Sequence, residues 1–119
     1  MEEHTIAELQ LMMARGETTA REIVEAYLHR IAEIDRDGPR LNSVIELNED
    51  ALEIASALDR ERRERGPRGP LHGIPILLKD NIDTADRTMT TAGSLALAGN
   101  YAARDATIVA RLRAAGAVI

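Results

Sequence analysis

The sequence predicts an α/β fold, in which helices near the N-terminus lead into a buried β-sheet with flanking helices. Apolar residues in the first half of the chain recur at the helical period of about 3.6. A later run, residues 74–78, is apolar throughout and follows a turn rich in glycine and proline. The last amphipathic stretch ends at Gly116, and the apolar residues 117–119 follow it at once. This order is typical of a strand, crossover helix and strand unit.

Two helices are expected to begin at Thr5 and Thr19. A glutamate follows each threonine three positions later, at Glu8 and Glu22, which is the pattern of a capping box that satisfies the free N–H groups of a helix start. The second helix has an apolar stripe opposite a face of Arg and Glu. The stripe consists of Ala20, Ile23, Val24, Tyr27, Leu28, Ile31 and Ile34. We expect this helix to end at 37–39, where the sequence is Asp-Gly-Pro.

In the middle of the chain, the sequence predicts one extended segment and one helix, and the helix has the stronger signals. Alternating apolar residues favour an extended segment over 41–47, although the polar residues 42 and 43 weaken this prediction. A third helix is expected from Asn48 to the charged run 61–65, and Gly66-Pro67 should stop it. A charged run of this kind is typically a solvated helix face.

The second half of the chain is expected to contain two strands joined by a helix. Residues 74–78 form the first expected strand, with Pro75 near its start, where a missing N–H costs least. Asp105 is expected to cap the last helix. Residues 117–119 open a second apolar strand without a closing turn, so we expect the natural chain to continue into the sheet.

The composition indicates a soluble globular protein without a nucleic-acid or membrane partner. The formal net charge is −5, and basic and acidic residues are interleaved rather than gathered into one stripe. No apolar run approaches the length of about 18 residues that a membrane span needs, and the N-terminus lacks the pattern of a secretion signal. Cysteine is absent, which fits a reducing cytoplasm but also a cysteine-free secreted protein. We expect a cytoplasmic protein.

No cofactor or metal site is predicted. The three histidines, His4, His29 and His72, have no spacing that would bring two of them onto one face, which disfavours a zinc site. The glycines lack the spacing of a phosphate-binding loop, so ATP binding is not expected. His72 precedes Gly73 and fits a turn.

Lys79 is the candidate catalytic residue. It is the one lysine among fifteen basic residues, and it stands directly after the apolar run and before Asp80. Desolvation at the end of a buried strand would disfavour the ammonium form and make the amine available as a base. Asp80 acts in the opposite direction, because a nearby carboxylate stabilises the ammonium, and the balance is left open. The alternative is a solvated charge at a strand end in an arginine-rich chain.

Residues 71–82, Leu-His-Gly-Ile-Pro-Ile-Leu-Leu-Lys-Asp-Asn-Ile, resemble the lysine-bearing motif of the amidase signature family. At matching distances they are followed by Thr-Thr-Ala-Gly-Ser at 90–94 and by the stretch 105–119. The segments 5–9 and 19–24 look like the N-terminal helices of that family. Linked motifs in the right order cover essentially the whole chain and are far more specific than one short pattern.

The resemblance implies a large mixed β-sheet and a Ser, cis-Ser, Lys triad that hydrolyses amide bonds. Lys79 matches the family lysine, which in its neutral form accepts a proton relayed by the bridging serine from the nucleophilic serine. In the family both serines follow in a glycine-rich segment beyond the stretch that matches this chain. Residues 1–119 are therefore expected to be the N-terminal part of a single amidase domain, truncated before that segment and inactive alone.

The sequence indicates less specific roles for the serines and for the residues beside Lys79. None of Ser43, Ser56 and Ser94 lies in a glycine-flanked nucleophile turn, and Ser94 is expected to be a turn or wall residue. Asp80 and Asn81 are expected either to orient Lys79 or to cap the strand end.

Several functions remain open within and outside the family. Residues 83–87 and 91–97 resemble stand-alone amidases of the peptide-amidase kind, which implies a small-molecule or peptide amide as substrate. The A subunit of a glutamyl-tRNA(Gln) amidotransferase ranks second, because it tends to have a cysteine near the threonine pair. A catalytically dead fragment or binding scaffold is a further alternative, and Schiff-base chemistry at Lys79 is a weaker one. A homodimer is compatible with the sequence.

Overall fold

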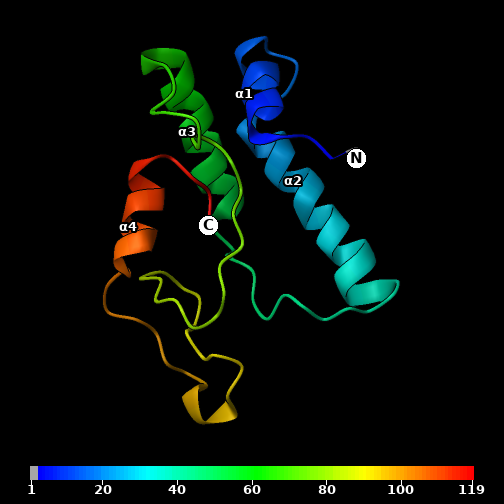
Figure 1. Ribbon diagram of the computed structural model, residues 1–119, viewed down its shortest axis with the longest axis vertical. Coiled ribbons are helices and arrows are strands. Elements are labelled where there is room, and N and C mark those ends of the chain that lie inside the picture. The colour runs from blue at the N-terminus through cyan, green and yellow to red at the C-terminus, as the bar shows by residue number, and fades with distance from the viewer. Residues whose placement is uncertain (1–2) are drawn as a thin grey trace.

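A computed structural model describes residues 3–119, in which helices alternate with long irregular segments (Figure 1). Helices α1, α2 and α3 lie toward one end of the molecule, and the long loop before α4 projects at the other end. In chain order the elements are α1 (Ile6–Ala14), α2 (Ala20–Arg30), the π-helical η1 (Ile31–Asp37), α3 (Ala51–Arg65), the 3₁₀ turn η2 (Leu95–Leu97) and α4 (Thr107–Ala114).

Both predicted capping boxes are confirmed. The hydroxyl of Thr5 accepts a hydrogen bond from the backbone N–H of Glu8 (3.2 Å), and the Glu8 carboxylate accepts one from the N–H of Thr5 (2.7 Å). Thr19 and Glu22 make the same reciprocal pair at the start of α2. Helix α2 continues without a break into η1, which ends at Asp37 as the Asp-Gly-Pro sequence predicts.

The core lies where α2 packs against α3 and is covered by α1 and by the two apolar segments of the second half. Small aliphatic side chains fill much of it, in keeping with a chain in which aromatic residues make up only 2%. Its buried members are Leu9, Met13, Ala20, Ile23, Val24, Ala51, Ala55, Leu58, Ile74 and Val118. The expected third helix is also confirmed, although it begins at Ala51 and its cap residue makes no side-chain capping bond.

Charged residues of α3 take part in the core, which sequence reasoning missed. The carboxylate of Asp59 is buried and accepts hydrogen bonds from the backbone N–H groups of Ala20 (2.8 Å) and Arg21 (3.1 Å), so α3 caps α2. Arg62 is half-buried and donates to the side chain of Gln10 (2.7 Å) and the carbonyl of His72 (2.9 Å). The expectation of a solvated face over 61–65 is therefore wrong at its first positions.

The predicted β-sheet is not formed within residues 3–119, where the only β-pairing is an isolated parallel bridge between Pro75 and Val118. The N–H of Val118 donates to Ile74 O (2.9 Å), and the N–H of Ile76 donates to Val118 O (2.8 Å). The expected strands 74–78 and 117–119 thus lie side by side and parallel. Neither is a strand, because a ladder requires consecutive residues to pair with a neighbouring segment.

The expected extended segment 41–47 is likewise irregular. Its backbone groups are bound by side chains of η1 rather than by a partner strand. The buried carboxylate of Asp35 accepts from the N–H groups of Ser43 (2.6 Å) and Val44 (3.2 Å), and Arg36 donates to the carbonyl of Val44 (2.6 Å). Hydrogen bonds from Ser43 outweigh the effect of burial and lower the pKa of Asp35.

His72 lies in a turn, as expected, and is completely buried. Its Nδ1 accepts from the backbone N–H of Arg68 (3.2 Å), so Nε2 carries the proton and donates to the carbonyl of Leu58 (2.9 Å). The Nε2 bond joins α3 to the segment that leads to Lys79, and the Nδ1 bond closes the turn at 68–72. Within residues 3–119 there is no cluster of metal-ligating side chains, and no helix has the length and apolar character of a membrane span.

Candidate active site

A cavity of about 970 Å³ lies between the helical end of the molecule and the segment around Lys79. Its walls come from α2 and η1, from the irregular residues 41–48 and from residues 74–82. Tyr27, Leu28 and Ile76 contribute apolar wall, whereas Lys79 and Asp80 contribute polar groups. A mostly apolar cavity of this size with a few polar groups is typical of a small-molecule site.

Lys79 lies on this cavity but is exposed, so the burial expected at the end of a strand is not found within residues 3–119. The carbonyl of Lys79 accepts from the N–H of Ile82 (3.0 Å), which begins a turn directly after the apolar run. In the described part of the chain Lys79 forms no ion pair. The side-chain nitrogen of Lys79 is therefore accessible to groups that enter the cavity.

Asp80 binds the turn at 91–93 instead of the amine of Lys79. Its Oδ2 accepts hydrogen bonds from the backbone N–H (3.1 Å) and the hydroxyl of Thr91, and its carbonyl accepts from the N–H of Ala92 (2.8 Å). This contact brings two of the sequence motifs together, because Ala92 and Gly93 line the same cavity as Lys79. Neither of the two roles expected for Asp80 anticipated this partner.

The serines of the described chain are all engaged in local hydrogen bonds. The hydroxyl of Ser94 accepts from the N–H of Ala96 (3.3 Å) and caps η2, which agrees with the turn role expected for it. Ser43 donates to Asp35, and Ser56 donates to the carbonyl of Leu52 (2.8 Å). Each of these hydroxyl groups stabilises the local structure around it, which is a structural role.

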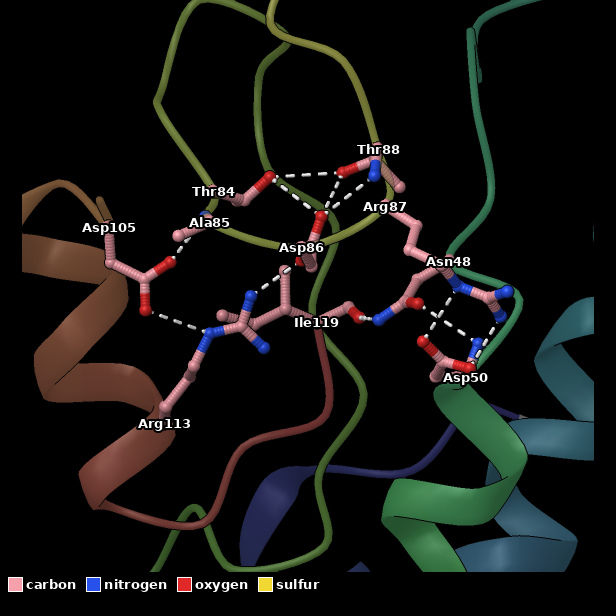
Figure 2. A network of polar contacts seen from close by, with 10 residues as sticks. All are labelled: Asn48, Asp50, Thr84, Ala85, Asp86, Arg87, Thr88, Asp105, Arg113 and Ile119. Atoms are coloured by element: carbon pink, nitrogen blue, oxygen red, sulfur yellow. Dashed lines mark hydrogen bonds and ion pairs between the residues drawn. The ribbon is translucent and has the colours of Figure 1, made fainter. Parts of the chain in front are cut away.

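Figure 2 shows how the loop 84–88 is joined to α4. Arg113 donates to Asp86 Oδ2 (2.5 Å) and to Asp105 Oδ2 (3.0 Å), and the other oxygen of Asp105 accepts from the N–H of Ala85 (2.7 Å). The prediction that Asp105 caps α4 is therefore wrong: the cap residue is Ala106, which makes no side-chain capping bond. The two oxygens of Asp105 bind the N–H of Ala85 and the Arg113 guanidinium, and neither bonds to the helix start.

The same loop reaches the start of α3 on its other side (Figure 2). Arg87 donates two hydrogen bonds to the carboxylate of Asp50 (2.5 and 3.1 Å). Asn48 donates to the carbonyl of Ile119 (2.8 Å) and accepts from the N–H of Asp50 (3.0 Å). From the sequence, residues 83–87 were used only for their family resemblance. Their mixture of short acidic, hydroxyl and Arg residues was the signal that could have predicted these polar contacts.

Comparison with known proteins identifies the family. The family model described as Amidase matches residues 22–119, which is most of the chain. The chain belongs to the amidase family.

Members of the amidase family with known structures share its backbone. The chain is 57% identical to the peptide amidase of Stenotrophomonas maltophilia, with a TM-score of 0.93 over 98% of this chain and 23% of that one. It is 44% identical to an amidase family protein of Bacillus anthracis, with a TM-score of 0.91 over 96% of this chain and 22% of that one. The amidase fold is therefore confirmed, although the described residues form no sheet.

The chain is also similar to a relative that is named as an amidotransferase subunit. In Salinispora arenicola, the A subunit of the glutamyl-tRNA(Gln) amidotransferase is 44% identical over 114 residues, which cover 95% of this chain and 22% of that relative. The chain spans about a fifth of the length of the curated relatives that it matches.

The ion pair of Asp86 and Arg113 predicts an acid-sensitive loop in this chain. Burial alone raises the pKa of Asp86, but hydrogen bonds from Thr88 and the Arg113 guanidinium outweigh it and hold this pKa below the usual 3.8. A lowered pKa in the folded state adds stability that is complete above the usual value and is lost as the pH falls through the folded value. Asp86→Asn should lower the free energy of unfolding of the complete protein by about 1–3 kcal/mol at pH 7.

The measurement is denaturant unfolding of the Asp86→Asn variant and the unchanged protein at pH 7 and below pH 4. The difference between them should shrink at the lower pH. Asp50→Asn is the matched control, because its pair with Arg87 is more exposed and should contribute about 1 kcal/mol or less. An equal loss for both variants would contradict the prediction.

Proposed function

We propose that the complete protein is an amide hydrolase and that Lys79 is the base of a Ser, cis-Ser, Lys triad. The observation that carries the proposal is the position of Lys79, a lysine without an ion-pair partner in residues 3–119, on the wall of a mostly apolar cavity. The likeness to a peptide amidase over nearly the whole chain supports it. The exposed face of Lys79 is where the serine-bearing segment of the complete protein would pack.

In this mechanism the neutral amine of Lys79 accepts a proton from the bridging serine. That serine takes the proton of the nucleophilic serine as its oxygen attacks the amide carbonyl. Collapse of the tetrahedral intermediate breaks the C–N bond, and the proton returns through the bridging serine to the leaving amine. Water then attacks the acyl-enzyme by the same proton route and releases the carboxylic acid. Lysine suits this role because its amine accepts a proton once it is desolvated, which a guanidinium does not.

The substrate class that we propose is a small-molecule or peptide amide. The higher identity to the peptide amidase (57%) than to the amidotransferase chain (44%) favours it. The complete protein should release ammonia from a peptide amide without a partner protein. Ammonia transfer that requires glutamine, ATP and charged tRNA would favour the amidotransferase.

We further propose a cytoplasmic protein that binds no nucleic acid, which its net charge of −5 supports, and a homodimer.

We also propose that residues 1–119 are the N-terminal part of one amidase domain. The support is that they correspond to 23% of the peptide amidase. We expect the coding DNA to continue for several hundred codons and soon to encode a Gly-Gly-Ser-Ser-Gly-like segment.

The isolated 119-residue polypeptide should be inactive and only marginally folded. It lacks the proposed nucleophile, and it exposes large apolar side chains such as Leu41 (64% exposed) and Leu77 (67% exposed). Circular dichroism, denaturant unfolding and an ammonia-release assay test the two statements separately. Cooperative unfolding of a monomer would contradict the statement on folding, and amide hydrolysis would contradict the statement on activity.

A further inference from the structure

We propose that Asp80 is a positioning residue for the reaction at Lys79, and that it holds the turn at 91–93 in place as a wall of the cavity. This inference rests on the proposed function. Asp80 immediately follows Lys79, and the two residues share the cavity with Ala92 and Gly93. A shift of Asp80 would therefore move the wall and the base relative to each other.

The turn needs an external anchor because its own conformation is strained. Ala92 has φ +50° and Gly93 has φ +73°, both in the left-handed region. For a residue with a Cβ, this region costs about 1–2 kcal/mol. Asp80 offsets that cost with two groups. Its carboxylate accepts hydrogen bonds from the N–H and the hydroxyl of Thr91, and its backbone carbonyl accepts one from the N–H of Ala92. Thr91 is only 7% exposed; its hydroxyl oxygen accepts from the N–H of Gly93 (3.1 Å) within the turn, and Asp80 is the acceptor for its hydroxyl hydrogen.

The rest of the loop anchors the turn from one side only. Thr90 and Asn100 bond reciprocally: the N–H of Thr90 donates to Asn100 O (2.8 Å), and the side chain of Asn100 donates to Thr90 O (2.8 Å). Residues 92–99 are all exposed, as Leu95 with 94% exposure illustrates. The loop is closed on itself by this pair, and within the described chain Asp80 is what joins the turn to the segment of Lys79.

The small residues of the turn indicate what the wall does. Ala92 and Gly93 line the same cavity as Lys79, and their small size leaves room for a substrate backbone. Reaction rates are sensitive to this geometry, because a misplacement of about 1 Å can cost a factor of about 10². The side chain of Asp80 thus acts through Thr91, and not through its charge on the amine.

The experiment compares Asp80→Ala with Asp80→Asn in the complete enzyme, with a peptide amide as substrate. Asp80→Ala removes the acceptor and should lower kcat/KM by about 10-fold to 100-fold. Asp80→Asn removes the charge but keeps an oxygen acceptor, and it should stay within about 3-fold of the unchanged enzyme, since a neutral acceptor still makes the hydrogen bonds. Equal losses in the two variants would overturn the inference, because they would point to the charge.

Thr91 provides a second test that does not depend on the folding of an Asp80 variant. Thr91→Val keeps the shape but removes the hydroxyl and should lower kcat/KM, whereas Thr91→Ser keeps the hydroxyl and should restore it. Because Asp80 and Thr91 act as a unit, the Asp80→Ala and Thr91→Val effects should be less than additive in the double variant. Full additivity would overturn the inference.

Asp83→Asn is the matched control for charge. Asp83 is exposed, lies outside the cavity lining, and in the described chain only its carbonyl accepts a hydrogen bond. Hydrogen exchange at the amide of Thr91, which donates to the Asp80 carboxylate, should accelerate in Asp80→Ala but not in Asp83→Asn. This measurement separates the two proposals: an enzyme without amidase activity contradicts the proposed function, whereas unchanged exchange contradicts the role of Asp80.

Discussion

Lys79→Ala should lower the turnover of the complete enzyme on a simple amide by a factor of about 10² to 10⁴, or more if a whole triad function is lost. Without the amine, the nucleophilic serine has no route by which to release its proton. Lys79→Arg should be nearly as damaging, because a guanidinium stays protonated at working pH and accepts no proton. Steady-state kcat and KM for ammonia release are the measurements, with circular dichroism as the control for folding.

The arginine variant decides between the two interpretations of Lys79. A solvated cation would tolerate arginine, since Lys79 is exposed and forms no ion pair within residues 3–119. Near-normal turnover of a folded Lys79→Arg enzyme would therefore exclude the proposed base. Borohydride trapping of the unchanged enzyme with a carbonyl substrate tests the Schiff-base alternative, and a trapped adduct at Lys79 would favour it.

Gly73→Ala should lower the free energy of unfolding by about 2–5 kcal/mol, the sum of backbone strain and overpacking. Gly73 has φ +80°, and a Cβ there would lie 2.7 Å from the Cβ of Ala20, which is completely buried at the start of α2. The N–H of Gly73 also donates to Gly116 O (2.7 Å), next to the bridge between Pro75 and Val118. A shift would therefore disturb the segment that leads to Lys79.

Gly16→Ala is the matched control for this substitution. Gly16 has a similar φ of +70°, but a Cβ there would meet no atom within 4 Å. Its cost should therefore be the backbone strain alone, about 1–2 kcal/mol. Denaturant unfolding of the complete protein measures both variants. If they lose the same free energy, close packing against Ala20 is not the reason for glycine at 73.

Local signals explain what could be predicted of the fold. A capping box joins residues three positions apart, so the starts of α1 and α2 follow from Thr5, Thr19 and their glutamates alone. The end of η1 at Asp37 depends on the neighbouring Gly38 in the same way. The predicted strands were wrong for the opposite reason, because a strand exists only when another segment pairs with it.

The helix starts, the small-residue core and the motif that contains Lys79 can all be found in the amino-acid sequence, because each depends on neighbours along the chain. The partners of the polar side chains depend instead on the tertiary structure. Asp59 caps α2 across 39 positions, Asp80 binds Thr91, and Arg113 joins Asp86 to α4. A carboxylate accepts a hydrogen bond from whichever donor the packing brings near, and the apolar packing of α2 on α3 sets those distances.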